Sequence, residues 1–277
     1  MKKSEINDKG AKGKMVEELK TQIETRAEKA EELRVFSGVK LLHIKKQVEL
    51  LLDHIGDYGI FAEYTKHDIS HIDEMLNIAE WIIPEKTKKV MTSSEWMMLV
   101  LAVYFHDMGM LFSKEEYDNR DNTEFKMYKK RVFNGEFGKD YISKIEKLED
   151  PDVFLFQEYI RKNHAKRIRI WISGQIDDSL HYTSHISEQI QKLIELIDNL
   201  FIQDLAMICE SHHLSNLDDY TIYNTNKCYE SADNAKVNLQ YIAVILRTVD
   251  LLHITMDRTP TIEFNAFCPT DPISVIE

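Results

Sequence analysis

The chain has few glycines, prolines and cysteines for its length. Nine glycines and five prolines are spread over 277 residues, and long stretches contain neither. Because these residues punctuate turn-rich β architectures, their scarcity favours an all-α fold. The three cysteines, Cys209, Cys228 and Cys268, are odd in number and have no C-x-x-C spacing. This pattern indicates reduced thiols and excludes a disulfide framework or a thiolate zinc site.

Positive charge and long apolar runs are also scarce. Lysine and arginine together number 35 against 47 acidic residues, a formal net charge of −12. A broad basic surface for phosphate backbones is therefore not expected, and double-stranded nucleic acid is disfavoured as a partner. No apolar run approaches the roughly 20 residues of a membrane span. The first residues are charged and contain no apolar signal region. We expect a cytoplasmic protein that does not enter a membrane.

The composition divides the chain into three parts. Residues 1–36 are a charged tail, in which 14–34 have helix-forming composition but few apolar positions, so we expect a mostly solvated helix or an oligomer contact. Residues 37–260 carry the apolar periodicity of packed helices. Within them, 112–150 are a charged insertion that could form a lid or an interface. Residues 261–277 are extended and proline-broken, and could lead to or contact a further domain.

The most informative stretch, residues 94–109, is almost wholly apolar until His106 and Asp107 stand side by side near its end. Thr92 and Glu95 form a capping box that predicts the start of a helix, and Gly109 lies where we expect its C-cap. Steps of three and four place the His–Asp pair on the buried stripe. An unpaired carboxylate in an apolar core costs several kcal/mol, so this pair needs a partner.

Four other predicted helices also carry a histidine or aspartate on their apolar side. These residues are His71 in 68–83, His164 in 151–171, His212 with His213 beside it in 200–213, and Asp250 in 236–256. One such residue is usually a satisfied core polar group, and Asp250 could simply pair with Arg247 on its own helix. Five helices together favour one buried divalent-metal site, because imidazole and carboxylate are ligands of zinc, manganese and iron.

The order of His71, His106-Asp107 and Asp250 resembles the H…HD…D signature of the HD superfamily of metal-dependent phosphohydrolases, over roughly residues 37–260. These families place the pair at a helix end, often as H-D-[IM]-G. The resemblance implies an HD-domain helical bundle with one or two divalent ions; Mn, Fe, Zn, Mg and Ni are not distinguished. The implied ligands are His71, His106, Asp107 and Asp250 for the first ion, and Asp107, His164 and His212 or His213 for the second.

The chain departs from one branch of that superfamily. The HD-GYP cyclic-dinucleotide phosphodiesterases have lysine where this chain has Met110, and their Gly-Tyr-Pro motif is absent, which disfavours cyclic di-GMP as a substrate. The blocks Y-T-K-H-D-I-S-H and Y-F-H-D-M-G-M are similar to HD domains at the front of bacterial proteins with chaperone-type ATPase domains. That similarity implies a bacterial source and an oligomer or partner ATPase domain. The resemblance to nucleotide-handling HD families, some of which act in antiviral defence, implies a defence role.

The hypothesis that follows is a phosphohydrolase acting on a nucleotide or nucleotide-like phosphate ester through a metal-activated water. Asp107 would orient the water, and whichever of His164, His212 and His213 is not a ligand would donate a proton. Candidate substrate contacts are His67, Arg161, Lys166, Arg167 and Arg258. The basic residues near His164 could equally be a solvated face, and His67 could join a third ion.

Two other functions fit the same residues. A non-catalytic module could use the metal site to sense a nucleotide and regulate a partner ATPase. An HD-type nuclease cutting single strands would suit the metals but not the net charge of −12.

Overall fold

The computed structural model describes residues 18–55, 69–148, 150–231 and 233–253, and their regular structure is almost entirely helical, as the composition predicts. The α-helices are α1 (Gln22–Glu28), α2 (Leu41–Leu52), α3 (Ile69–Ile82), α4 (Glu85–Lys88), α5 (Ser93–Phe105), α6 (Lys114–Asp118), α7 (Phe125–Phe133), α8 (Lys139–Ile145), α9 (Pro151–Ser173), α10 (Ser184–Ile194), α11 (Asn199–Ser211) and α12 (Leu239–Leu252). Short 3-10 turns are η1 (Lys29–Glu32), η2 (Arg34–Phe36), η4 (Met108–Met110), η5 (Arg120–Asn122), η6 (Asp178–Thr183) and η7 (Asp233–Ala235).

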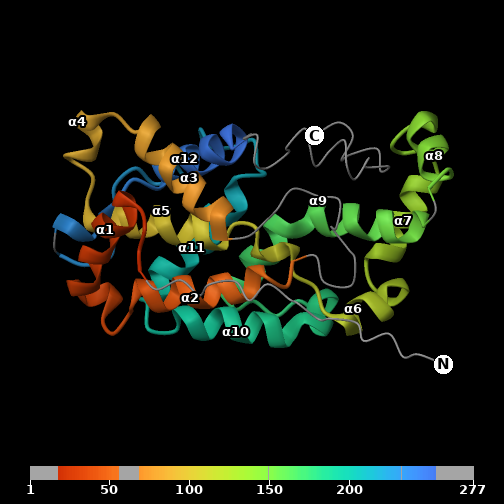
Figure 1. Cartoon of the computed structure of the whole chain (residues 1–277), viewed down its shortest axis with the longest axis horizontal. Helices are drawn as coiled ribbons and strands as arrows, with labels where there is room; N and C mark the ends of the chain where they lie inside the picture. The colour runs from red at the N-terminus through yellow and green to blue at the C-terminus, as the bar shows by residue number, and fades with distance from the viewer. Residues whose placement is uncertain (1–17, 56–68, 149, 232, 254–277) are drawn as a thin grey trace, which may run out of the picture.

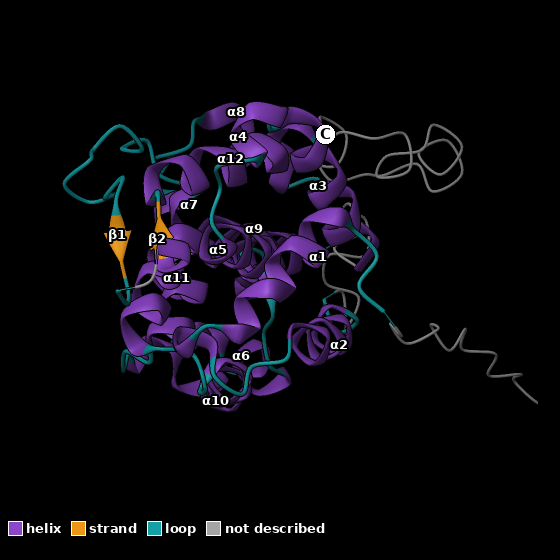
Figure 2. Ribbon diagram, turned by 90° about the vertical axis from the view of Figure 1, so that its left-hand side faces the viewer, coloured by secondary structure: helices purple, strands orange, loops and turns teal. Residues whose placement is uncertain are grey.

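Helix α5 is the centre of the bundle. It begins with the predicted capping box, in which the Thr92 hydroxyl accepts from the Glu95 amide and the Glu95 carboxylate accepts from the Thr92 amide. All its residues from Trp96 to Phe105 are buried, as expected of a helix that is apolar on every side. Figure 2 shows α5 near the middle of a ring formed by the other helices.

The expectation that no apolar run could span a membrane is wrong as a statement of length and composition. Residues 93–118 are long and apolar enough to cross a membrane. Their apolar part is wholly buried inside the fold, however, as is the core helix of a soluble protein.

The helices around α5 form two connected parts. Helices α1, α3, α11 and α12 pack on α5, and α9 packs on α11 and on η4. Figure 1 shows α9 leading away from this part toward α7 and α8. There the insertion and the first half of α9 share a second core, in which Phe125 of α7 makes edge contacts with Phe156 and Tyr159 of α9. Its suggested role as a lid or interface remains a prediction.

Helix α1 corrects the expectation of a solvated N-terminal helix. Ile23 and Ala27 of α1 and Ala30 of η1 are completely buried in the main core, and Glu24 of α1 is buried as well. The apolar stripe is not evident in the sequence because it is narrow and made mostly of small residues, and because a glutamate completes the buried face.

The polar loop before α12 is anchored to the bundle. Strands β1 (Lys227–Cys228) and β2 (Lys236–Val237) pair antiparallel, with Lys227 opposite Val237. The Thr92 hydroxyl donates to the Lys236 carbonyl over 2.6 Å, so the loop is attached to the start of α5. Cys209 and Cys228 are free thiols, as predicted, and Cys268 lies outside the described residues.

Candidate metal centre

The His–Asp pair lies where α5 ends, earlier than predicted. The helix ends at Phe105, His106 is its C-cap, and Asp107 leads into η4. Gly109 is therefore not the C-cap. Its role is close approach, because a Cβ there would lie 1.9 Å from the His164 carbonyl oxygen on α9. The missing side chain lets α9 lie directly against the turn that carries Asp107.

The predicted histidines and aspartates converge from five helices and the turn after α5. They form two groups, His71 with His106 and Asp250, and His164 with His212 and His213. In each group the potential ligand atoms lie within 4.8 Å of one another. This confirms the predicted convergence, and these residues could hold metal ions.

Asp107 lies between the two groups. Its Oδ2 is 3.1 Å from Nε2 of His106 and 3.5 Å from Nε2 of His71, while its Oδ1 is 3.3 Å from Nε2 of His164. Asp250 faces the first group, with Oδ1 3.8 Å from Nε2 of His106. One carboxylate therefore offers one oxygen to each group, which is the arrangement of a bridging ligand.

Three of the histidines have their tautomer fixed by their own helix. Nδ1 of His106 lies 2.9 Å from the Val103 carbonyl oxygen and Nδ1 of His164 lies 2.6 Å from that of Arg161. His212 makes the same contact with the Cys209 carbonyl. A carbonyl only accepts, so each Nδ1 carries a hydrogen, and Nε2 is the nitrogen of each ring that faces the centre. Metal-binding histidines are held in this way.

The Nε2 atoms of His164 and His212 face each other at 2.8 Å. Two lone pairs at that distance repel unless a cation lies between them. Burial, with the neighbouring His164 and His106, holds the pKa of His212 well below its ordinary value. Two buried imidazole nitrogens that face each other form a donor set that fits a divalent metal ion.

The first group attracts positive charge. Burial opposes protonation of His106, but the carboxylates of Asp107 and Asp250 outweigh it and raise the pKa of His106 to about 9. In the second group, burial and the neighbouring His164 lower the pKa of His213 to about 4.

One residue at the centre was not among the predicted site residues. His253 follows α12, is buried, and places its Nδ1 2.9 Å from Nδ1 of His71. Its spacing of three residues after Asp250 was the signal available in the sequence, since residues three apart on a helix share a face.

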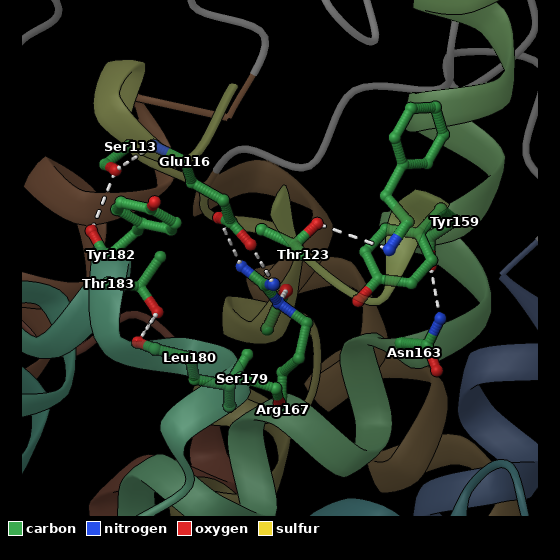
Figure 3. Close-up of polar contacts among 12 residues, drawn as sticks. Ser113, Glu116, Thr123, Tyr159, Asn163, Arg167, Ser179, Leu180, Tyr182 and Thr183 are labelled. Atoms are coloured by element: carbon green, nitrogen blue, oxygen red, sulfur yellow. Dashed lines mark hydrogen bonds and ion pairs between the residues drawn. The ribbon is translucent and has the colours of Figure 1, made fainter. Parts of the chain in front are cut away.

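The prediction that Arg167 binds substrate is wrong. Its guanidinium is buried and paired with both carboxylate oxygens of Glu116, at 2.6 and 3.0 Å. It also donates to the Gly109 carbonyl at 2.9 Å and to the Leu111 carbonyl at 2.8 Å. Figure 3 shows this pairing between α9 and α6. Arg167, one helical turn after His164, thus connects α9 to η4 and to the insertion.

The other predicted substrate contacts have mixed positions. Arg161 is half-buried and paired with Glu158 on its own helix, at 2.8 Å. The neighbouring Lys162, which is not one of the predicted contacts, lies over the ring of Phe137, 4.2 Å from its centre. Lys166 is exposed. Roles for Arg161 and Lys166 remain predictions, and His67 and Arg258 lie outside the described residues.

An all-α bundle with buried histidine and aspartate groups at the end of its central helix defines an HD-type domain. The family model described as HD-CE matches residues 61–277. The chain belongs to the HD-CE family. No curated protein and no solved structure matches it.

Proposed function

We propose that this protein is a metal-dependent phosphohydrolase acting on a nucleotide or a nucleotide-like phosphate ester. The observation that carries the proposal is the pair of facing Nε2 atoms of His164 and His212, 2.8 Å apart and each with its Nδ1 directed at a backbone carbonyl. A histidine pair that only stabilised the core would instead place a hydrogen on one of the facing nitrogens.

The residues divide naturally between two ions. His71, His106 and Asp250 would hold one, His164 and His212 the other, and Asp107 would contact both. Such an ion supplies a water of pKa about 7 and a Lewis acid for a phosphoryl oxygen. The charge of Asp107 between the groups would offset the repulsion of two cations and orient the attacking water.

The structure favours His212 over His213 as the ligand of the second group. His212 is buried and has its tautomer fixed, whereas His213 is exposed beside the ring of His164. His213, with a pKa of about 4, has no proton to give at neutral pH. It would instead contact the substrate or complete the ligand set, and water would supply the proton that the leaving oxygen takes up.

The deciding experiment combines metal analysis of the purified protein with phosphate release from a panel of nucleotides, with and without Mn²⁺. We expect bound divalent metal, turnover of at least one nucleotide, and loss of both in Asp107→Ala. The exposed Asp121→Ala serves as the control. Wild type without metal, or full activity of Asp107→Ala, contradicts the proposal. Metal and nucleotide binding without turnover would indicate a sensing module.

A further inference from the structure

We propose that His253 is a positioning residue that accepts the Nδ1 hydrogen of His71 and so keeps Nε2 of His71 available to a metal ion. The inference rests on the metal centre of the proposed function and assigns a task to a buried side chain outside the two ligand groups. It starts from the contact between the two Nδ1 atoms, 2.9 Å apart.

His71 differs from the other histidines of the centre in how its ring is held. His106, His164 and His212 each contact the backbone carbonyl three residues earlier in the chain. His71 lies near the start of the described part of α3, which begins at Ile69. Among the described contacts, Nδ1 of His71 meets a side chain at the end of α12, whereas Nδ1 of each of the other three meets a carbonyl.

The ring hydrogens of His71 and His253 can be assigned if Nε2 of His71 binds a metal ion. Nε2 of His71 faces Oδ2 of Asp107 at 3.5 Å, the oxygen that also lies 3.1 Å from Nε2 of His106. If Nε2 binds a metal ion, it carries a lone pair, and the ring hydrogen is on Nδ1. Nδ1–H then donates to Nδ1 of His253, which must be the acceptor.

The reverse assignment gives a different site. If His253 donated to His71, the hydrogen of His71 would be on Nε2 and directed at Asp107. The separation of 3.5 Å is longer than the 2.7–3.2 Å typical of an N–H···O hydrogen bond. It suits a nitrogen and an oxygen that share one ion, since each would lie about 2.0–2.2 Å from it.

The ring of His253 is itself held in place, so it can keep the ring of His71 in a fixed orientation. Its side chain is 3% exposed, its amide donates to the Val249 carbonyl at 3.0 Å, and its ring meets that of His71 edge to face with centroids 4.5 Å apart. It lies one turn after Asp250. The end of α12 therefore supplies one candidate ligand and the support of another, so both depend on the position of the same helix.

Two substitutions separate hydrogen bonding from packing. His253→Asn can place its amide oxygen near the position of Nδ1 and keep an acceptor, whereas His253→Leu fills similar space without one. We expect His253→Leu to weaken Zn²⁺ or Mn²⁺ binding about 10- to 100-fold, the usual effect of removing a group that supports a ligand. His253→Asn should retain most of the affinity. The exposed His181→Leu is a control for histidine loss elsewhere.

The measurement is titration of the metal-free protein with each ion, beside thermal unfolding of the metal-free variants. Similar metal-free stability of the Asn and Leu variants, with different affinities, supports the positioning role. Equal affinities of these two variants, or wild-type affinity in His253→Leu, overturns it. Metal binding without phosphate release would overturn the hydrolase and leave this inference standing.

A second measurement does not depend on any variant. Long-range ¹H–¹⁵N spectra of the zinc-loaded protein report which ring nitrogen of His71 carries hydrogen. We expect hydrogen on Nδ1 and zinc on Nε2. Hydrogen on Nε2 of His71 would overturn the inference whatever the affinities.

Discussion

Two buried polar clusters share helices α3 and α5, and they are built in opposite ways. Asp73 and Tyr104 belong to one cluster, whereas His71 and His106 belong to the other. Residues two apart on a helix point about 200° away from each other. Each helix therefore offers one residue to a cluster on either side of it.

The first cluster carries its own cation. The ammonium group of Lys45 is wholly buried and lies 2.7 Å from Glu24 and 2.5 Å from Asp73, and the Tyr104 hydroxyl donates to Glu24 over 2.5 Å. In the metal centre, the described contacts instead bring His164 and His212 together through their lone pairs. A buried cluster whose charges are paired by its own side chains stabilises the fold. A buried cluster in which hydrogen-bond acceptors face each other is suited to binding an added cation.

The strongest test of the first cluster is Lys45→Met. Removing the cation leaves Glu24 and Asp73 without it in the interior, and breaking a buried ion pair costs about 3–5 kcal/mol. We expect a loss of that size in the free energy of unfolding measured in urea. Adding Glu24→Gln to Lys45→Met should recover part of it. A single variant as stable as wild type would mean that Lys45 does not hold the cluster together.

In the metal centre, His212→Leu should not lower the stability of the metal-free protein, in contrast to Lys45→Met in the first cluster. Without metal, the variant should be as stable as wild type or more so, because the substitution removes a repulsive contact. With metal at about 1,000 times its Kd, one ion should stabilise wild type by about 4 kcal/mol, and the variant should lose this stabilisation. Thermal unfolding with and without chelator measures both. A metal-free variant that is strongly destabilised would place His212 with the fold-supporting groups.

Gly109→Ala should connect the fold to the metal centre. The new Cβ would clash with the His164 carbonyl, and such overpacking costs about 1–3 kcal/mol. Because the clash pushes α9 away from Asp107, metal affinity should fall as well. Gly135→Ala is the matched control, since it meets no neighbour but has a φ of +88°. Only the first variant should change metal binding in a titration.

The smallest expected effect is on acid stability. Burial raises the pKa of Glu24, but Lys45 and Tyr104 outweigh it and hold that pKa below the ordinary 4.5. Its stabilisation is therefore present above pH 4.5 and lost as the pH falls through the lowered folded-state pKa. Urea midpoints of wild type and Glu24→Gln should approach each other below pH 4.5. A constant difference down to pH 3 would contradict this.

Much of the fold and the centre was predictable, because helical periodicity shows which face of a segment is buried. That was enough for the capping box at Thr92, the helix around His164 and the convergence of His71 with Asp250. Periodicity does not show what the buried face meets. Arg167 has the composition of a phosphate contact, but its partner Glu116 is 51 residues away in the chain.

The other differences between prediction and structure also arise from contacts between segments far apart in the chain. Gly109 follows a helix and so resembles a C-cap, yet its role depends on the approach of α9. His253 supports a histidine 182 residues earlier. Such contacts are set by how helices cross, and a single sequence does not contain that information in local form.

The salt-bridged cluster has a consequence for anyone who would produce this domain as a fragment. Glu24 and Lys45 both precede residue 61, where the family match begins. A fragment starting there would contain every candidate metal ligand, yet Asp73 and Tyr104 would lose these partners from inside the bundle. The shortest piece that looks complete by its motifs would be missing part of its interior, so expression trials should begin ahead of α1.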